Sequence, residues 1–306
     1  RHVKEQPMKN MKKRFKREWQ MHLMLLPGIL LIFIFSYIPL YGLVIAFEDY
    51  NPGRGFSSPW VGIKHFQFLF SQPNFVRTIW NSLYIAVFKM LGGISVSVLF
   101  ALLLNEIGNK ILKRIFQTLI YIPNFLSWVI LAGILTDLLA ADGLVNQTLQ
   151  AFGGNPVNFL GSPSVFPWTM IISDIWKGFG FGTVVYLAAL TSIDPELYEA
   201  ARIDGGGKLA QTRFITLPML APTIVLMLVL SLGSVLNAGF DQIYNLYAPV
   251  VYDTGDIIDT YVYRLGITQA QYSVGTAVGL FKSVISMILV VASYKLADKL
   301  ANYRIF

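Results

Sequence analysis

Six long apolar stretches dominate this 306-residue chain and constrain its fold more than any other feature. A helix needs about 20 mostly apolar residues to cross the hydrocarbon core of a bilayer. Only 13% of the residues are charged, whereas a soluble domain has about 25%. The sequence therefore predicts an all-α membrane protein with about six transmembrane helices, at Leu23–Phe47, Leu83–Asn105, Thr118–Leu138, Pro167–Leu190, Ala221–Phe240 and Thr276–Ala297.

The lysines and arginines predict the orientation, because cytoplasmic loops of membrane proteins carry an excess of both. Seventeen of them lie in the N-terminal arm, in the loops after the second and fourth stretches, or in the tail, and four lie in the other loops. This asymmetry predicts that both termini are cytoplasmic. It divides the chain into a basic arm (1–22), a transmembrane domain (23–298) with a cytoplasmic loop at about 191–220, and a tail (299–306). We interpret the arm as an orientation signal that contacts anionic lipid, with no nucleic-acid role.

The sequence offers no residues for enzymatic chemistry or metal binding. It has no cysteine, and its three histidines are far apart and lack metal-ligand spacing. ATP hydrolysis needs a glycine-rich loop ending in Gly-Lys-Ser/Thr, and the nearest match, Gly207-Lys208-Leu209, lacks the hydroxyl residue. We therefore expect no catalytic residue, no metal and no cofactor bound by this chain. Glycines within the spans are expected to permit close helix packing instead: Gly92, Gly93, Gly178, Gly180 and Gly182.

The loop between the fourth and fifth stretches has the features of a short capped helix. Asp194 is placed to cap free backbone N–H groups, and Pro195 suits the first helical position. Glycines 205–207 favour a helix end, because glycine accepts a left-handed conformation. A second short helix is expected at about 208–216. The sequence thus predicts a helix–turn–helix across the cytoplasmic side of the membrane.

The first of these helices suits contact with another protein. Ala200 and Ala201 let a partner's backbone approach closely, while Glu199, Arg202 and Asp204 supply polar contacts. The alternative is an amphipathic helix that rests on lipid. Such a helix is expected to show bulky apolar residues opposite lysines, and this segment has few large apolar residues on any one face.

This loop resembles the signature of the permease subunits of ABC importers, which is Glu-Ala-Ala, three residues, Gly, nine residues and Ile-x-Leu-Pro. The chain matches every defined position with Glu199-Ala200-Ala201, Gly205, Ile215, Leu217 and Pro218. The wider sequence is similar to the carbohydrate-uptake branch and to its LplB-like oligosaccharide permeases. The stretches that carry this similarity are 186–190, 193–205, 240–247 and 259–263, together with Pro123, Ser127-Trp128 and Gly143-Leu144-Val145-Asn146. One departure is Gly206, where sugar permeases commonly have alanine and which is expected to loosen the turn.

The resemblance implies a type I importer permease fold in a bacterial cytoplasmic membrane. It implies that the segment Glu199, Ala200, Ala201, Arg202, Asp204 and Gly205 belongs to a coupling helix that docks on a separate ATPase. ATP and Mg would then be bound by two partner ATPase subunits. The implied partners also include a second permease subunit in a heterodimer, and an extracellular sugar-binding lipoprotein that delivers an oligosaccharide. Transport would follow alternating access, with ATP binding moving the coupling helices.

Charges inside the spans are the best local indication of a solute path, since each costs about 2.5–3.5 kcal/mol on insertion scales. One interpretation is structural: Asp174 and Lys177 pair along one helical face, and Lys89 and Lys282 reach the membrane interface. The other is that these charges line a polar cavity, where unpaired lysines would meet the carboxylates of uronic acids. With neighbouring aromatic and amide groups that suit sugar binding, the candidate path is Lys89, Asp174, Trp176, Lys177, Phe179, Asn237, Asp241, Tyr244 and Lys282.

Other functions remain open from the sequence. One alternative is an importer permease for a solute other than sugar. Another is a channel or an ion-driven secondary carrier, although the chain shows no convincing internal duplication of the kind that carriers often have. An intramembrane enzyme is disfavoured because catalytic groups are missing.

Overall fold

The computed structural model describes the backbone of residues 7–301 and the side chains of residues 18–295. Within these residues the regular structure is helical, apart from isolated bridges in the loop that follows the first span. Residues 1–6 and 302–306, at the ends of the predicted arm and tail, lie outside it. The elements are α1 (Pro7–Ile32), η1 (Phe33–Tyr37), η2 (Ile38–Phe47), α2 (Lys64–Ser71), α3 (Pro73–Glu106), α4 (Lys110–Phe125), α5 (Trp128–Leu138), α6 (Leu144–Ala151), α7 (Phe166–Leu190), α8 (Pro195–Ile203), α9 (Lys208–Gln211), η3 (Thr212–Thr216), α10 (Leu217–Leu232), α11 (Phe240–Leu246), η4 (Pro249–Val251), α12 (Tyr252–Gly255), α13 (Ile258–Val262), η5 (Tyr263–Thr268) and α14 (Tyr272–Ala301).

The membrane-crossing segments agree with the predicted all-α membrane fold. In the described chain, four helical segments are long and apolar enough to span a bilayer: Glu18–Phe47, Pro73–Glu106, Lys208–Leu232 and Tyr272–Lys295. The bent pair α4 and α5 is a fifth candidate. α7 has 25 residues, enough to cross, but it is less apolar because it carries Asp174 and Lys177. These segments correspond to the six predicted stretches.

The third predicted stretch, Thr118–Leu138, is not one straight helix. α4 and α5 are bent by 102° where they meet. Pro123 lies in the last turn of α4, where its missing N–H removes a helical hydrogen bond. Ser127 then caps α5, its hydroxyl oxygen accepting from the backbone N–H of Ile130 at 3.3 Å. Length and apolarity alone predicted a single span, because neither property reports on backbone hydrogen bonds.

The fifth predicted stretch, Ala221–Phe240, also runs across a break. α10 ends at Leu232, the following residues through Gly239 are not helical, and α11 begins at Phe240. Gly239 has a positive φ of 98°, a conformation that glycine adopts without steric cost. Among the described residues, two of the predicted spans are therefore interrupted, one at residues 126–127 and the other at residues 233–239.

α3 and α7 form the central helix pair, and small residues allow their close approach. A side chain at Gly92 or Gly182 would collide with the neighbouring helix, and one at Gly180 would collide with the main chain of α4. The packing role predicted for these glycines is confirmed. Gly93 and Gly178 have open space where a side chain would be, so the same prediction is wrong for them.

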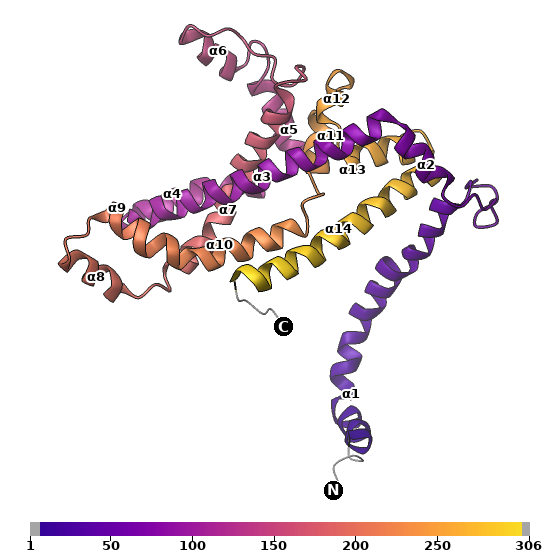
Figure 1. Ribbon diagram of the computed structural model, residues 1–306, viewed down its shortest axis with the longest axis horizontal. Coiled ribbons are helices and arrows are strands. Elements are labelled where there is room, and N and C mark those ends of the chain that lie inside the picture. The colour runs from indigo at the N-terminus through magenta and orange to yellow at the C-terminus, as the bar shows by residue number, and fades with distance from the viewer. Residues whose placement is uncertain (1–6, 302–306) are drawn as a thin grey trace.

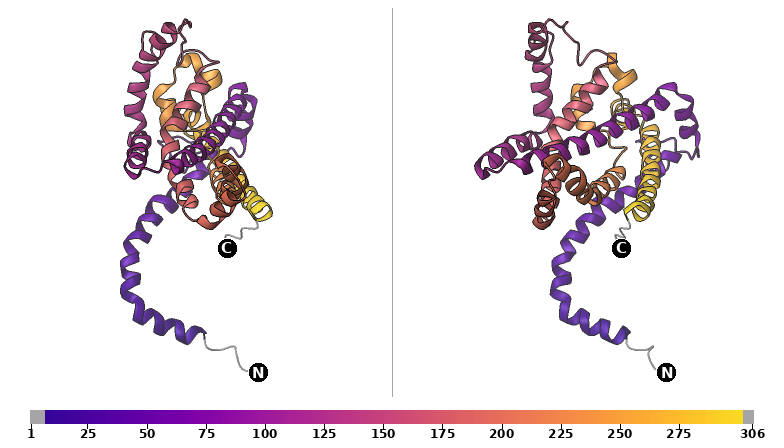
Figure 2. Two further views of the ribbon diagram at one scale, coloured as in Figure 1. Left: turned by 90° about the vertical axis from the view of Figure 1, so that its left-hand side faces the viewer. Right: turned by 60° about the vertical axis from the view of Figure 1, so that its left-hand side comes forward.

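The connecting segments gather at two ends of α3 (Figure 1). α8 and α9 lie near its C-terminal end, and α2, α12 and α13 lie near its N-terminal end. α5, α6 and α11 follow the two helix breaks, and α5 packs against α11. We call these three helices the outer layer; α6 projects from the rest of the molecule (Figures 1 and 2).

α1 stands apart from the other helices. It extends away from the body in each view of Figures 1 and 2, while η2 packs against α14. Most apolar side chains between Leu23 and Tyr41 are exposed. α1 runs through residue 22 as one helix, so the arm and the first span are continuous.

We expect Gly180→Ala to destabilise the protein more than Gly178→Ala, because only the first adds a methyl group against the backbone of α4. Overpacking of this kind costs about 1–3 kcal/mol. Thermal unfolding of the purified complex in detergent measures the difference. Equal melting temperatures for the two variants would show that α4 and α7 do not pack through Gly180.

Candidate functional site

The cytoplasmic helix α8 has the caps predicted from its sequence. The Asp194 carboxylate accepts from the backbone N–H of Glu196 at 3.0 Å, and Pro195 occupies the first turn. At the other end Gly205 has a φ of 80°, and the N–H of Gly206 donates to the carbonyl of Ala201 at 2.7 Å. Both ends of this nine-residue helix are therefore fixed by local hydrogen bonds.

Gly206 tightens the turn, contrary to the expectation that it would loosen it. A Cβ at this position would lie 2.7 Å from the carbonyl oxygen of Ala201, closer than carbon and oxygen atoms normally approach. The second predicted helix also differs from the expectation. Residues from Lys208 to Leu232 form one continuous helical segment. Pro218 lies inside it, directly after the π-helical turn η3, where the backbone hydrogen bonds already depart from the α-helical pattern.

Side-chain contacts attach α8 to the transmembrane helices. The hydroxyl of Tyr198 lies 3.1 Å from that of Thr216, at the start of α10. Lys208 forms an ion pair with Glu106 at the end of α3. Tyr198 also packs against the buried cluster around Tyr186 and Leu220. α8 is thus linked through Tyr198 to α7 and α10, and the adjoining α9 is linked through Lys208 to α3.

The outward surface of α8 is free in the described structure. None of its residues is buried, and Ile203 and the following Leu209 and Phe214 are highly exposed, at 87%, 84% and 72%. Beside α8 lies a polar groove of about 360 Å³, lined in part by Glu199, Arg202 and Lys208. The predicted coupling residues Glu199, Ala200, Ala201, Arg202, Asp204 and Gly205 all lie in α8 or the turn that follows it.

In the membrane region, Lys89 is the centre of a buried polar network. Its side chain is only 8% exposed, and its ammonium donates to the carbonyl of Ala238 at 2.7 Å and to the side-chain oxygen of Gln242. Asp174 lies 3.5 Å away. Lys89 therefore does not reach the membrane interface. It joins α3 and α7 to the break between α10 and α11.

Sequence reasoning missed Gln242. It is fully buried, and its amide nitrogen donates to the carbonyl of Met170 and to the hydroxyl of Ser173, both at 2.8 Å. The amide is thus bonded on both sides, as a buried polar group requires. A glutamine three residues after Gly239 is a weak sequence signal, because nothing in the sequence shows that it faces inward.

A small polar cavity of about 220 Å³ lies beside this network. It is lined by three predicted path residues, Lys89, Asp174 and Asn237, and also by Ser231, Ser234 and Gly239. These residues come from α3, α7 and the α10–α11 break. The structure therefore brings together three of the residues that the sequence singled out.

The predicted pair of Asp174 and Lys177 does not form. Asp174 faces Lys89, while Lys177 donates to the main-chain oxygen of Asn124 at 3.0 Å and lies 5.6 Å from the centroid of the Trp128 ring. Lys282 donates to Asp259 of α13 at 2.5 Å. Each of the three intramembrane lysines has a polar partner within the protein, so none of them is unpaired. A contact between these lysines and uronic-acid carboxylates stays a prediction.

The aromatic candidates fall into separate environments. Tyr244 is 39% exposed and stacks on Phe240 with ring centroids 5.2 Å apart. Trp176 is 44% exposed on α7, whereas Phe179 packs against Phe100 at 4.5 Å, between α7 and α3. Tyr244 and Trp176 remain available to a solute, as does the exposed Asp241. Phe179 is chiefly a packing residue.

Next to the outer layer, Arg264 and Asp256 form a buried ion pair. The guanidinium donates two hydrogen bonds to the carboxylate, one of them 3.2 Å long. Burial lowers the pKa of Arg264, but its bonds and charge interaction with Asp256 outweigh this, so the pKa rises overall. Burial is also the largest cause that raises the pKa of the nearby Tyr247 to about 12. Tyr247 therefore stays protonated at neutral pH.

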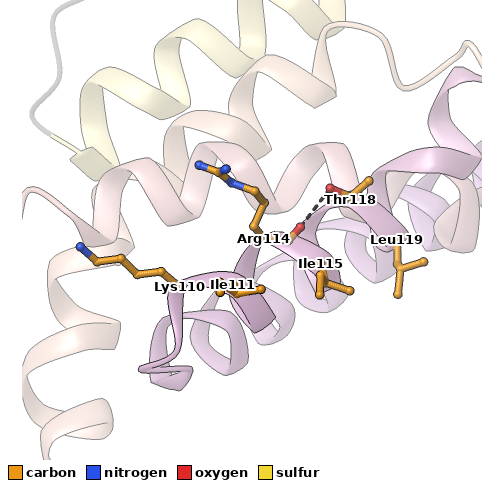
Figure 3. Close-up of a pocket in the computed structure, with 6 residues that line it drawn as sticks. All are labelled: Lys110, Ile111, Arg114, Ile115, Thr118 and Leu119. Atoms are coloured by element: carbon orange, nitrogen blue, oxygen red, sulfur yellow. Dashed lines mark hydrogen bonds between the residues drawn. The ribbon is translucent and has the colours of Figure 1, made fainter.

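The exposed face of α4 carries a broad hollow of about 480 Å³ (Figure 3). Its lining comes from this one helix: Lys110, Ile111, Arg114, Ile115, Thr118 and Leu119. The Thr118 hydroxyl donates to the carbonyl of Arg114 at 3.0 Å, as the dashed line shows. Because no second element closes it, we interpret the hollow as an open surface and not as a solute site.

Residues 93–302 match the protein family described as the binding-protein-dependent transport system inner membrane component. This match covers more than half of the chain, including α8 and the residues of the polar cavity other than Ala86, Lys89 and Met90. The chain belongs to this family. It is thus an inner-membrane transport component, not an enzyme, and among its described residues no group of three or more His, Cys, Asp or Glu side chains forms a metal site.

Two relatives from Bacillus subtilis (strain 168) align over nearly the whole chain. The polygalacturonan/rhamnogalacturonan transport system permease protein YteP is 43% identical, over 94% of this chain and 90% of its own length. Protein LplB is 41% identical, over 95% and 92%. A chain in the solved structure of a bacterial alginate ABC transporter, in complex with an alginate pentasaccharide-bound periplasmic protein, is 39% identical. It superimposes with a TM-score of 0.87 over 96% of this chain and 99% of that one.

We expect Lys89→Met to lower stability strongly, because it leaves the buried oxygens of Ala238 and Gln242 without their donor. A buried polar group left unpaired costs about 1–3 kcal/mol. Lys64→Met is the matched control, since Lys64 is 64% exposed. The melting temperature of the complex should fall for Lys89→Met alone. An unchanged value would mean that the network does not hold the helix break.

Proposed function

We propose that this chain is a permease subunit of an ATP-driven importer that takes up an oligosaccharide. The observation that carries the proposal is its identity to two proteins over 94% of its length or more: 43% to a permease with polygalacturonan in its name, and 39% to a chain of a solved alginate ABC transporter. The chain would work by alternating access in the bacterial cytoplasmic membrane. Its N and C termini would lie in the cytoplasm, as the distribution of lysine and arginine favours.

We infer that α8 is the coupling helix. It is capped at both ends, exposed on its outer face, and bonded through Tyr198 to Thr216 at the start of α10, while the adjoining α9 is bonded to α3 through Lys208. A rigid element with these attachments suits the transfer of rigid-body motion from a soluble partner. Two ATPase subunits, which would bind ATP and Mg, would dock on this face of the permease pair.

The remaining partners are proposed on the same basis. A second permease, related but not identical, would complete the solute path at the subunit interface. An extracellular sugar-binding lipoprotein would deliver the oligosaccharide, as the periplasmic protein in the alginate transporter complex suggests. Trp176, Tyr244, Asn237 and Asp241 offer aromatic faces and polar groups that suit a sugar.

An ion-driven carrier is less well supported. Interrupted helices in carriers often leave free carbonyl groups that bind the coupling ion. At both interruptions in this chain, lysine ammonium groups bond main-chain carbonyls, those of Ala238 and Asn124. Positively charged groups of the protein thus stand where a cation would be expected. A related importer for another solute remains the second candidate.

The test is uptake by the reconstituted complex. The permease pair, its ATPases and its binding lipoprotein are placed in liposomes, and ATP hydrolysis and uptake are measured with a panel of oligosaccharides. We expect a subset of oligosaccharides to stimulate both. Uptake that continues without the ATPases but needs an ion gradient would contradict the proposal. Stimulation only by amino acids or peptides would contradict the proposed solute and favour an importer for a solute other than sugar.

We expect Glu199→Lys to uncouple transport from hydrolysis, because it reverses a charge on the exposed face of α8 without touching the caps. Uptake should fall at least tenfold while the protein remains inserted. Glu196→Gln, in the first turn of the same helix, is the control and should transport normally. Normal uptake by Glu199→Lys would exclude this face of α8 as the ATPase contact.

We expect Trp176→Ala to raise the KM for oligosaccharide uptake, because it removes an exposed aromatic face from α7. Phe181→Ala is the matched control: Phe181 is 59% exposed on a different side of the same helix. Uptake at several oligosaccharide concentrations separates affinity from expression level. Identical KM values for the two variants would remove Trp176 from the solute path.

A further inference from the structure

The outer layer is joined to the inner helices at two breaks, and a lysine holds each one. At the α10–α11 break, Lys89 donates to the carbonyl of Ala238 at 2.7 Å. At the α4–α5 bend, Lys177 donates to the carbonyl of Asn124 at 3.0 Å. Asn124 lies in the last turn of α4, where carbonyls lack helical partners and carry partial negative charge. Ala238 lies in the non-helical stretch between α10 and α11. In both places the ammonium group supplies a donor to a carbonyl that has no helical partner.

α7 fixes the inner side of the α4–α5 bend by two neighbouring contacts. The backbone of α7 at Gly180 touches the carbonyl of Ile120, and one turn away Lys177 bonds Asn124. The Lys177 ammonium also lies 5.6 Å from the centroid of the Trp128 ring, the first residue of α5, within the range of a cation–π contact. Lys177 therefore touches both arms of the bend.

The segment beyond the bend is stiff, so a change of angle would be carried outward. Asn146 of α6 is fully buried and bonds the main chain at Ala140 and Val157, with three bonds of 2.8–3.0 Å. α5 itself has 11 residues and is about 16 Å long. A change of about 20° in the bend would move its far end by about 6 Å.

α7 also connects the bend to the cytoplasmic side. Its C-terminal end is followed within five residues by α8, and Asp174, one turn before Lys177, faces Lys89 at the second break. One helix thus carries contacts to both breaks and leads directly to α8. A movement of α7 would reach the outer layer through the two lysines.

We propose that Lys177, together with Lys89, is a positioning residue that sets the orientation of the outer layer relative to α3, α4, α7 and α10. The consequence for transport rests on the proposed function: displacement of α8 reorients the outer layer through α7. Lys177 in this role contacts the protein's own backbone and not the solute. Its effect on uptake is therefore on turnover and not on affinity.

The test measures distances in the assembled importer. The chain has no cysteine, so spin labels are placed at Phe152→Cys, beyond α6, and Met287→Cys, on α14; both native side chains are highly exposed, at 89% and 70%. Lys177→Met is compared with Lys177→Arg, which keeps the charge and donors, and with Lys64→Met as the control. Pulsed electron–electron double resonance gives the distribution of distances between the two spin labels in the resting complex without solute.

We expect Lys177→Met to shift or broaden the distance distribution by about 6 Å, the displacement that a change of about 20° in the α4–α5 bend would produce. Lys177→Arg should give the parental distribution. Lys64→Met should match the parent. In uptake assays Lys177→Met should lower the maximal rate with KM unchanged. A parental distance distribution for Lys177→Met overturns the proposal, and so does a raised KM with a parental distribution.

If Lys177→Met does not assemble, Lys177→Ala takes its place, because it also removes both the donor and the charge. A parental distribution in that variant equally overturns the proposal. The distance measurement in the resting complex does not depend on which solute is carried. If the parent complex transports no oligosaccharide, the proposed function fails while the distances still decide the role of Lys177.

Discussion

Backbone hydrogen bonding in hydrocarbon is the constraint on which the rest of this structure depends. A membrane offers no water to free N–H and C=O groups, so a span can be interrupted only where the protein supplies other partners. This chain has two interruptions, at the α4–α5 bend and between α10 and α11. At each of them a lysine from a neighbouring helix donates to a main-chain carbonyl. Lys89 and Lys177 are thus explained by the breaks that they stabilise, whereas Lys282 pairs with Asp259.

The same constraint explains why α7 carries charged residues within its span. It carries Lys177 for one break and Asp174, which balances the charge of Lys89 at the other. Its glycines bring it close enough for these contacts, since Gly180 and Gly182 lie directly against neighbouring helices. Close packing and buried charge are therefore two parts of one arrangement. At its cytoplasmic end the same helix leads into α8, so the polar network and the docking surface share one rigid element.

Most of the fold was predictable because it depends on local properties. Apolar length located the spans, and Asp194, Pro195 and Gly205 located the ends of α8, since caps act within a few residues. The breaks were not predicted, because Pro123 and Gly239 also occur in continuous spans and only their surroundings decide the outcome. The pairing of Asp174 was predicted with Lys177 at helical spacing, yet its partner is Lys89. Gln242 gave only a weak signal, because its burial depends on how α7 and α11 face each other.

The sequence by itself determined that the chain is a membrane-spanning protein, which loop carries the importer signature, and where a short capped helix lies in that loop. These follow from composition, periodicity and residues within one turn of each other. Only the tertiary structure decided which charges meet, which spans bend, and that Lys89, Asp174 and Asn237 border one cavity. Such pairings join residues far apart in the chain, and the energy of a buried charge depends on the partner that packing brings within hydrogen-bond distance.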